Sequence, residues 1–233
     1  MSTAEQLQEM YERLHGRFGA QDWWPGDSPF EIMVGAILTQ NTNWKNVERA
    51  IDNLKRAEVL SLDAMSDLPQ DLLAEYIRPA GYYNIKAVRL RNFFTLINGH
   101  WGGDLDFFLS QPRDTLREQL LSVKGIGPET ADSMVLYAAG QPIFVIDAYT
   151  HRILTRHEII DEFFDYHAIQ EMFMDNLEED TRLFNEYHAL IVQVGKDFCK
   201  KSKPACTDCP LAGLNGIFTV CPADQSTKNR YLD

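Results

Sequence analysis

The sequence lacks any apolar run long enough to cross a bilayer, and its first residues have no apolar centre like that of a signal peptide. It also lacks net positive charge, because 34 acidic residues outnumber 22 Lys and Arg residues and give a formal charge of −12 at pH 7. Such a chain is not expected to adhere broadly to nucleic acid or acidic membranes, although it can still carry a local basic face. We therefore expect a cytoplasmic protein that does not enter a membrane.

Cysteine is missing from most of the chain, and all four cysteines fall close together near its end. They are Cys199, Cys206, Cys209 and Cys221, with the spacing C-x6-C-x2-C-x11-C. In a reducing compartment such a cluster favours metal ligation over disulfides. Four thiolates in a short span suit a [4Fe–4S] cluster or Zn, and the spacing alone leaves both open.

The alternating apolar pattern of strands is also missing, as are internal repeats and low-complexity linkers, so we expect an all-α fold. Residues 142–146 are β-like but too short to start a sheet. Ser28-Pro29-Phe30-Glu31 predicts a capping box at a helix start. Helices are predicted over residues 1–18, 30–40, 44–55, 69–77, 84–97, 113–122, 147–157, 166–177 and 181–194, with a further helix after residue 127.

Charge is distributed unevenly along the chain. No Lys or Arg lies between His157 and Arg182, whereas acidic residues are frequent there, which predicts a solvated face. The basic residues fall into three groups, and we expect them to form a local phosphate-binding face near the candidate site. These groups are Lys86, Arg89 and Arg91; Arg152 and Arg156; and Lys196, Lys200, Lys201 and Lys203.

The stretch from Leu120 to His151 combines an anion-binding turn with a carboxylate. Gly125-Ile126-Gly127 is a tight turn between two predicted helices, where backbone N–H groups and a helix N-terminus converge. Asp147 opens the next helix and could act beside a phosphate held by the turn. The alternative for Asp147 is a plain helix N-cap.

Three segments resemble the helix-hairpin-helix (HhH-GPD) DNA glycosylases of the endonuclease III superfamily. They are L-x-x-V-K-G-I-G-P-E-T-A-D (120–132), V-I-D-A-Y-T (145–150) and K-P-x-C-x-x-C-P-L (203–211). The resemblance implies two helical domains: a six-helix barrel-like domain (28–141) with the hairpin, and a second domain (1–27 plus 142–233) with an iron–sulfur loop. It also implies a monomer, nucleoid-associated in a bacterium or archaeon, whose partner is double-stranded DNA containing a damaged base.

The resemblance assigns roles to particular residues. It makes Asp147 the catalytic aspartate and Cys199, Cys206, Cys209 and Cys221 the ligands of a [4Fe–4S] cluster. It places Gly125 and Gly127 against a DNA phosphate, with a monovalent cation at the hairpin. It further implies that Gln40 fills the gap left by the extruded base and that Tyr82 wedges into the opposite strand. Lys124 and Glu129, at the two ends of the hairpin, complete the expected DNA-binding set.

The sequence departs from the family pattern at two positions. Bifunctional members carry a Schiff-base lysine two residues after the second hairpin glycine, where this chain has Glu129. A carboxylate cannot form the imine, so the resemblance implies a monofunctional glycosylase without lyase activity. The family usually places the fourth cysteine where this chain has Asn215, and Cys221 is assigned on the assumption of a longer loop.

The aromatic residues indicate the substrate. Trp23, Trp24, Pro25 and Trp44 resemble the 3-methyladenine DNA glycosylase branch, in which aromatic side chains line the base pocket, and Lys196 is expected to line it too. Electron-rich rings favour a cationic alkylated purine. The alternative for each tryptophan is a core or loop anchor, and for Lys196 a surface lysine. The alternative function is an endonuclease III-like glycosylase for mismatched or oxidised bases, such as thymine opposite guanine. A noncatalytic DNA-structure-binding protein and a redox sensor are less favoured.

Overall fold

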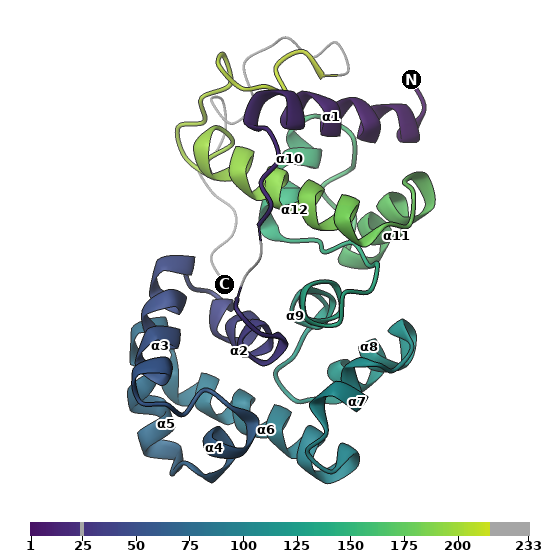
Figure 1. The fold of residues 1–233 in the computed structure, drawn as a ribbon. Coiled ribbons are helices and arrows are strands. Elements are labelled where there is room, and N and C mark those ends of the chain that lie inside the picture. Colours follow the sequence, from purple (N-terminus) through teal and green to yellow (C-terminus); the bar gives the residue numbers. More distant parts are fainter. Residues whose placement is uncertain (24–25, 215–233) are drawn as a thin grey trace. The chain divides into compact units, whose positions relative to one another are not determined.

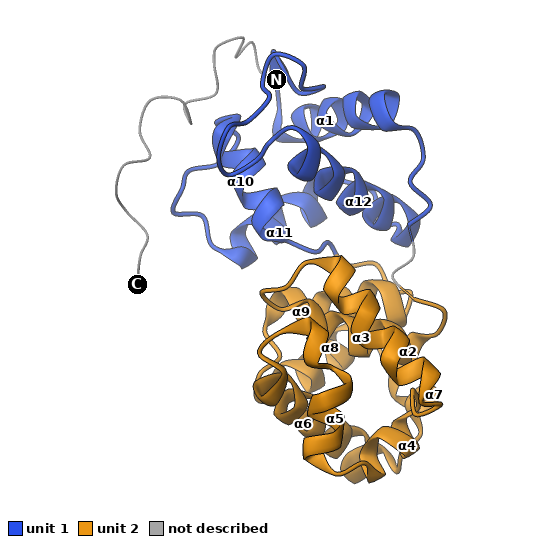
Figure 2. Cartoon of the chain, turned by 90° about the vertical axis from the view of Figure 1, so that its left-hand side faces the viewer, with its two compact units in different colours: residues 1–23, 144–233 blue, residues 24–143 orange. Residues whose placement is uncertain are grey.

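The computed structural model describes residues 1–23 and 26–214, and within these ranges the regular secondary structure is helical, with no strand (Figure 1). The expected all-α fold is therefore confirmed. The chain divides into two compact units: unit 1 comprises residues 1–23 and 144–233, and unit 2 comprises residues 24–143 (Figure 2). No helix of the described residues is long and apolar enough to cross a membrane.

Unit 1 is built around its last helix, which packs against the first and tenth helices of the chain. Tyr187 of this last helix is fully buried, and its hydroxyl donates to the carbonyl of Leu7 at 2.8 Å. Phe144 and Phe173 stack beside it with ring centroids 3.9 Å apart. The helices of unit 1 are α1 (Thr3–Phe18), α10 (Ala148–Arg156), α11 (Tyr166–Asn176) and α12 (Thr181–Asp197).

Unit 2 is built around α2, which is apolar on every side and is buried along most of its length. A helix of this composition is stable only when other helices surround it, and α2 contacts α3, α6, α9 and η2. The helices of unit 2 are α2 (Pro29–Thr39), α3 (Trp44–Arg56), α4 (Leu62–Asp67), α5 (Gln70–Tyr76), η1 (Arg78–Ala80), α6 (Tyr83–Trp101), α7 (Leu105–Leu109), α8 (Arg113–Ser122), α9 (Pro128–Ser133) and η2 (Met134–Ala138).

Two details of unit 2 differ from the sequence expectations. The short helices α4 and α7 were not predicted, because six and five residues hold too few turns to show a helical period. The capping box at the start of α2 is half formed: Ser28 Oγ accepts from the Glu31 N–H at 3.2 Å. The Glu31 carboxylate lies 2.8 Å from Lys55 Nζ, so it bonds across to α3 rather than back to Ser28.

The two helices of the hairpin are joined by an ion pair that is partly hidden from water. Arg117 Nε of α8 donates to Asp132 Oδ1 of α9 at 2.6 Å, and Asp132 has no exposed surface. Directly after α9 the chain forms a single π-helical turn, η2, of a kind that is frequent near functional sites. The pair therefore holds the hairpin helices together at one end, and the glycine turn links them at the other.

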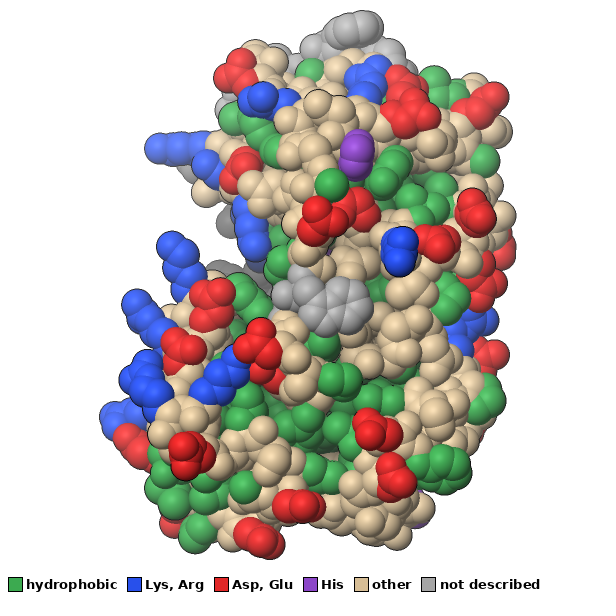
Figure 3. Space-filling model, viewed as in Figure 1, with side chains coloured by type: hydrophobic (Ala, Val, Ile, Leu, Met, Phe, Trp, Pro, Cys, Tyr) green, Lys and Arg blue, Asp and Glu red, His purple; other side chains and the backbone are tan. Residues whose placement is uncertain are grey.

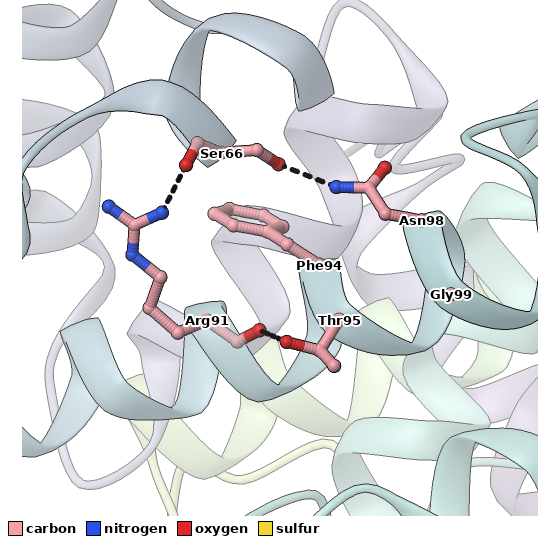
Figure 4. Close-up of a pocket in the computed structure, with 6 residues that line it drawn as sticks. All are labelled: Ser66, Arg91, Phe94, Thr95, Asn98 and Gly99. Atoms are coloured by element: carbon pink, nitrogen blue, oxygen red, sulfur yellow. Dashed lines mark hydrogen bonds between the residues drawn. The ribbon is translucent and has the colours of Figure 1, made fainter.

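A pocket of unit 2 lies between α4 and α6 (Figure 4). Its polar atoms bond to one another: Asn98 Nδ2 donates to Ser66 Oγ at 3.0 Å, and Arg91 donates to the Ser66 carbonyl. These bonds tie α4 to α6. It is lined by Ser66, Arg91, Phe94, Thr95, Asn98 and Gly99.

Candidate functional site

The hairpin turn has the backbone geometry that its glycines predict. Gly125 has φ +101°, and a Cβ added there would lie 2.5 Å from Cγ of Arg89. Any other residue would be strained by its φ and would also collide with Arg89. Gly127 caps α9, with Pro128 at the first helical position, and both glycines are exposed. An exposed helix N-terminus of this kind can receive an anion, and phosphate binding here stays a prediction.

The carbonyl groups of the turn already accept hydrogen bonds. Asn92 Nδ2 donates to the Lys124 carbonyl at 2.9 Å, and Gln40 Nε2 donates to the Gly125 carbonyl at 3.0 Å. A carbonyl has two lone pairs, so these groups retain some capacity for a cation. The monovalent cation at the hairpin stays a prediction. The side chains of Lys124 and Glu129 are exposed at the two ends of the turn.

Gln40 is bonded to the hairpin rather than extended into solvent. It follows the last residue of α2, and its Nε2 donates to Thr130 Oγ1 at 3.0 Å as well as to Gly125. Its Oε1 accepts from Arg89 Nη1. To fill a gap in DNA, the side chain would have to exchange these three bonds for bonds to bases. This arrangement could not be predicted from the sequence, because the partners of Gln40 come from distant segments.

The expected cluster of Lys86, Arg89 and Arg91 on a phosphate-binding face is wrong for Lys86. Only 1% of Lys86 is exposed. Its Nζ donates to the carbonyls of Leu38 and Ala80, each at 2.8 Å. Arg89 and Arg91 are directed to Gln40 and to the Ser66 carbonyl. The three residues lie on one helix, α6, but they serve three internal contacts.

Tyr82 is presented on the surface by an unusual turn. It caps α6 with φ +46°, in the left-handed region, directly after Gly81 at φ +67°. The side chain of Tyr82 is 68% exposed, and Ile85 on the next turn is 54% exposed. An exposed apolar pair beside a strained turn is consistent with a wedge, and the wedge role stays a prediction. Sequence reasoning missed Ile85, whose exposure departs from the apolar periodicity of α6.

Asp147 caps α10 and lies beside a buried histidine. Its Oδ1 accepts from the Thr150 N–H at 2.7 Å and from Thr150 Oγ1 at 2.8 Å, so the N-cap interpretation is confirmed. Its Oδ2 lies 3.8 Å from His188 Nε2 of α12. Burial lowers the pKa of His188; the Asp147 carboxylate opposes this shift, and the charge of Lys196 adds to it. The catalytic role of Asp147 stays a prediction, and His188 is a neighbour that the sequence did not reveal.

The start of α10 fits closely against the end of α12. A Cβ on Gly195 would collide with the ring of Tyr149, so this glycine permits the approach. Arg152 lies over the Tyr149 ring, 4.9 Å from its centroid, and its Nε donates to the Cys199 carbonyl at 2.8 Å. Arg152 is therefore bonded within unit 1. Lys196, in the last turn of α12, is exposed, as expected of a surface lysine.

The tryptophans expected in the base pocket belong to different parts of the chain. Trp23 is half-buried in unit 1, and Trp24 and Pro25 lie outside the described residues. Trp44 is half-buried at the start of α3 in unit 2. Its ring lies against α2, 3.6 Å from where a Cβ on Gly35 would be. This contact supports an anchoring role for at least part of the Trp44 ring.

Three of the four candidate cysteine ligands lie in the part of the chain that the structure describes. Cys199 is buried, and its Sγ accepts from Arg156 Nη1 at 3.2 Å. Cys206 and Cys209 are half-buried, and Cys221 lies outside the described residues. Within residues 1–23 and 26–214 no three His, Cys, Asp or Glu side chains are grouped closely enough to hold a metal ion. The described residues therefore do not form a ready metal site.

The surface charge agrees in part with expectation. The nine acidic residues between His157 and Arg182 are all exposed, which confirms a solvated face. Figure 3 shows Lys and Arg side chains gathered along the edge of unit 2 that α3 forms. Lys55 is tied there to Asp27 at 2.7 Å and to Glu31. The basic residues of α3 are Lys45, Arg49, Lys55 and Arg56.

Comparisons with known proteins identify the family and the fold. A candidate DNA repair glycosylase of Methanocaldococcus jannaschii is 46% identical over 209 residues, covering 89% of this chain and 94% of that protein. The structure of the Helicobacter pylori 3-methyladenine DNA glycosylase bound to 1,N6-ethenoadenine has a TM-score of 0.71 and 29% identity, covering 84% of this chain and 98% of that one. An endonuclease III–DNA complex has a TM-score of 0.78 at 22% identity, covering 92% of this chain and 95% of that one, and shows the shared fold.

The family match covers the central part of the chain. Residues 34–179, which contain the hairpin and Asp147, match the HhH-GPD superfamily of base excision DNA repair proteins. The match spans more than half of the sequence and agrees with the resemblance inferred from the hairpin motif. The chain belongs to the HhH-GPD superfamily of base excision DNA repair proteins and has the fold of its DNA glycosylases.

Proposed function

We propose that this protein is a monofunctional DNA glycosylase that removes alkylated purines, such as 3-methyladenine, from double-stranded DNA. The observation that carries the proposal is the carboxylate of Asp147, fixed at the N-terminus of α10 within the matched region. The 29% identity to a 3-methyladenine glycosylase structure, over 84% of this chain, supports the choice of base.

The bonds to Asp147 suit electrostatic catalysis. Thr150 engages only Oδ1, through its N–H and its hydroxyl, and so fixes the plane of the carboxylate. Breaking an N-glycosidic bond develops positive charge on the sugar, and a preorganised carboxylate stabilises that charge and orients a water molecule. The target base must first leave the stack, which gives Gln40 and Tyr82 their proposed roles at the vacated position.

Glu129 carries the proposal that the enzyme has no lyase activity. Its side chain is exposed at the second position of α9, where a Schiff-base lysine would act in bifunctional relatives. A carboxylate has no nitrogen with which to form an imine to the sugar. Water is therefore the nucleophile, and the product is an intact abasic site.

The choice of an alkylated purine follows from its charge. An N3-alkylated adenine is cationic and already a good leaving group, so modest catalysis is enough. Aromatic faces bind such a cation, and we propose this role for Trp23, Trp24 and Trp44, with Pro25 and Lys196 beside them. The Trp44 ring also lies against Gly35, and this contact limits the part of the ring that can stack on a base.

A panel of duplexes, each carrying one lesion, tests the function. We expect release of free 3-methyladenine and no adduct trapped by borohydride. A Glu129→Lys variant is the matched control for trapping, because it restores an amine at the second position of α9. Release of thymine from a G·T pair, or of an oxidised pyrimidine, without release of any alkylated base would overturn the substrate proposal. A trapped adduct with the unchanged protein would overturn the monofunctional mechanism.

We also propose that Cys199, Cys206, Cys209 and Cys221 bind a [4Fe–4S] cluster. The support is their spacing and the Lys203–Leu211 motif, with the burial of Cys199. No catalytic step depends on the cluster. Anaerobically purified protein should contain about four iron and four sulfide ions per chain, and one bound zinc without sulfide would overturn this assignment.

A further inference from the structure

Lys86 places a charged group inside unit 2 without an acidic partner. Its side chain is 1% exposed, and no acidic side chain among the described residues forms an ion pair with it. Its Nζ instead donates to the Leu38 carbonyl at 2.8 Å, Thr42 Oγ1 at 2.9 Å and the Ala80 carbonyl at 2.8 Å. An ammonium group has three N–H donors, so this site uses all of them. Such a buried charge persists only where its bonds fully replace those of water.

The three acceptors lie in or directly beside the two loops that carry the candidate DNA-contacting residues. Leu38 and Thr42 lie on either side of Gln40, in the last turn of α2 and the loop after it. Ala80 ends η1 and directly precedes the turn that exposes Tyr82. The Thr42 hydroxyl, besides accepting from Lys86, donates to the Ala80 carbonyl, so the two loops are also bonded to each other.

We propose that Lys86 is a positioning residue that fixes the Gln40 loop against the Tyr82 turn. In this way the side chains of Gln40 and Tyr82 are held at the spacing at which both can enter the same DNA duplex. The proposal rests on the glycosylase function and on DNA-contacting roles for Gln40 and Tyr82. Lys86 does not touch DNA, because it is buried. It acts through the backbone on which those two side chains are mounted.

The bonds of Gln40 show why such an anchor is needed. Its amide is bonded to Gly125, Thr130 and Arg89, and it must leave them to enter DNA. The loop also contains Asn41 at φ +54°, a left-handed conformation that asparagine adopts more readily than most residues. Because Lys86 holds the Leu38 carbonyl and the Thr42 hydroxyl, on either side of Gln40, the side chain of Gln40 can move while the loop keeps its place.

The ammonium form of Lys86 matters for this role. Burial and the neighbouring charge of Arg89 lower the pKa of Lys86 to about 8. Among the described residues, α2, η1 and the loop after α2 present only carbonyls and the Thr42 hydroxyl to Nζ. A neutral amine has two N–H groups and a lone pair, so deprotonation removes one bond and turns a lone pair toward an oxygen. The Gln40 loop should therefore be held less firmly against the Tyr82 turn as pH rises through about 8.

The test uses the full chain and a duplex in which 2-aminopurine lies opposite a stable abasic-site analogue. Entry of Gln40 and Tyr82 changes the stacking of 2-aminopurine, and its fluorescence reports this without a cleavable lesion. In Lys86→Met we expect the fluorescence change to fall at least about tenfold, since small misplacements have large effects. Affinity for undamaged duplex should stay within about twofold, because phosphate contacts that give such affinity lie elsewhere.

Two variants separate positioning from loss of stability. Leu90→Ala, one turn along α6, opens a cavity in the same core but leaves the three acceptors bonded, and should keep the fluorescence change. Thr42→Val removes one acceptor and the link to Ala80 without emptying the core, and should lose part of the change. This variant decides the matter if Lys86→Met does not fold.

The pH dependence gives a readout that a purely structural role would not move. In the unchanged protein the fluorescence change should decrease between pH 7 and 9, and in Lys86→Arg, which keeps its charge, it should stay level. A Lys86→Met or Thr42→Val response equal to that of the unchanged protein would overturn the positioning role. If the unchanged protein gives no fluorescence change and releases no base, the proposed glycosylase function fails instead.

Discussion

Each unit buries one basic side chain beside a candidate functional residue, and the two basic groups meet different partners. His188 of unit 1 lies 3.8 Å from the carboxylate of Asp147, a gap across which charge acts but no hydrogen bond forms. Lys86 of unit 2 makes three hydrogen bonds of 2.8–2.9 Å to uncharged oxygens. His188 can therefore act on Asp147 only through charge, when it is protonated, whereas Lys86 acts through the geometry of its hydrogen bonds. Changes around Asp147 should alter reaction rate, and changes around Lys86 should alter DNA distortion and stability.

The sharpest test of this comparison is Asp147→Asn. Asparagine caps helices as well as aspartate does, so the bond from the Thr150 N–H can be kept and unit 1 should stay folded. The carboxylate charge is lost, and the single-turnover rate of base release should fall at least about 100-fold. Affinity for lesion-containing duplex should change little. Rates under single-turnover conditions and a binding titration measure the two effects.

Asp165→Asn is the matched control for that experiment. Asp165 caps α11 in the same unit by accepting from the Ala168 N–H at 2.9 Å, and it is exposed. The same chemical change there should leave the rate of base release unaltered. If both variants lose activity equally, or if Asp147→Asn retains full activity, Asp147 is only a helix cap and the catalytic assignment is wrong.

Gly125→Ala tests the geometric side of the comparison. An alanine at φ +101° has a strained backbone, and its Cβ would lie 2.5 Å from Cγ of Arg89. The guanidinium of Arg89 is the group that donates to Gln40, so a shift of Arg89 would also disturb Gln40. We expect the free energy of unfolding to fall by about 1–3 kcal/mol, together with weaker binding of undamaged duplex. Gly127→Ala is the control for stability, because φ at Gly127 is −100° and a Cβ there would meet nothing within 4 Å. Equal urea midpoints for the two variants would contradict the close approach at Gly125.

The sequence predicted those features that depend on neighbours in the chain. The glycine turn, the cap at Asp147 and the apolar centre of α2 follow from local propensities, and the structure contains all three. The short helices α4 and α7 were missed because they contain fewer than two turns. Their place depends on packing against α6, which no local pattern records.

The polar contacts of the candidate site could not be predicted in the same way. Lys86 was assigned to a phosphate-binding face because its charge is visible in the sequence, whereas its acceptors at Leu38, Thr42 and Ala80 are two backbone carbonyls and a hydroxyl. Backbone carbonyls carry no residue-specific signal. The approach of His188 to Asp147 likewise arises from the packing of α12 on α10. The sequence shows which side chains carry charge, but only the fold shows which groups those side chains contact.

The smallest expected effect concerns the charge of His188. Its pKa in the folded protein lies below the usual value of 6.5, mainly because it is buried, so it is neutral near pH 7. As pH falls through that pKa, an imidazolium forms 3.8 Å from Asp147 Oδ2 and offsets the negative charge for which we propose the role of stabilising the sugar cation. The rate of base release should therefore rise with pH below 6.5 and then level off. In His188→Gln, which does not titrate, the rise should shift to lower pH.

The free energy of unfolding should also rise with pH in this range. A histidine with a lowered folded-state pKa binds fewer protons folded than unfolded, so the free energy of unfolding falls as pH drops below 6.5. In His188→Gln this part of the acid destabilisation should disappear. His167→Gln is the control, because His167 is exposed on α11 of the same unit. If the pH profiles of rate and stability in His188→Gln match those in His167→Gln, the two buried groups do not differ as proposed, and unit 1, like unit 2, is organised by geometry alone.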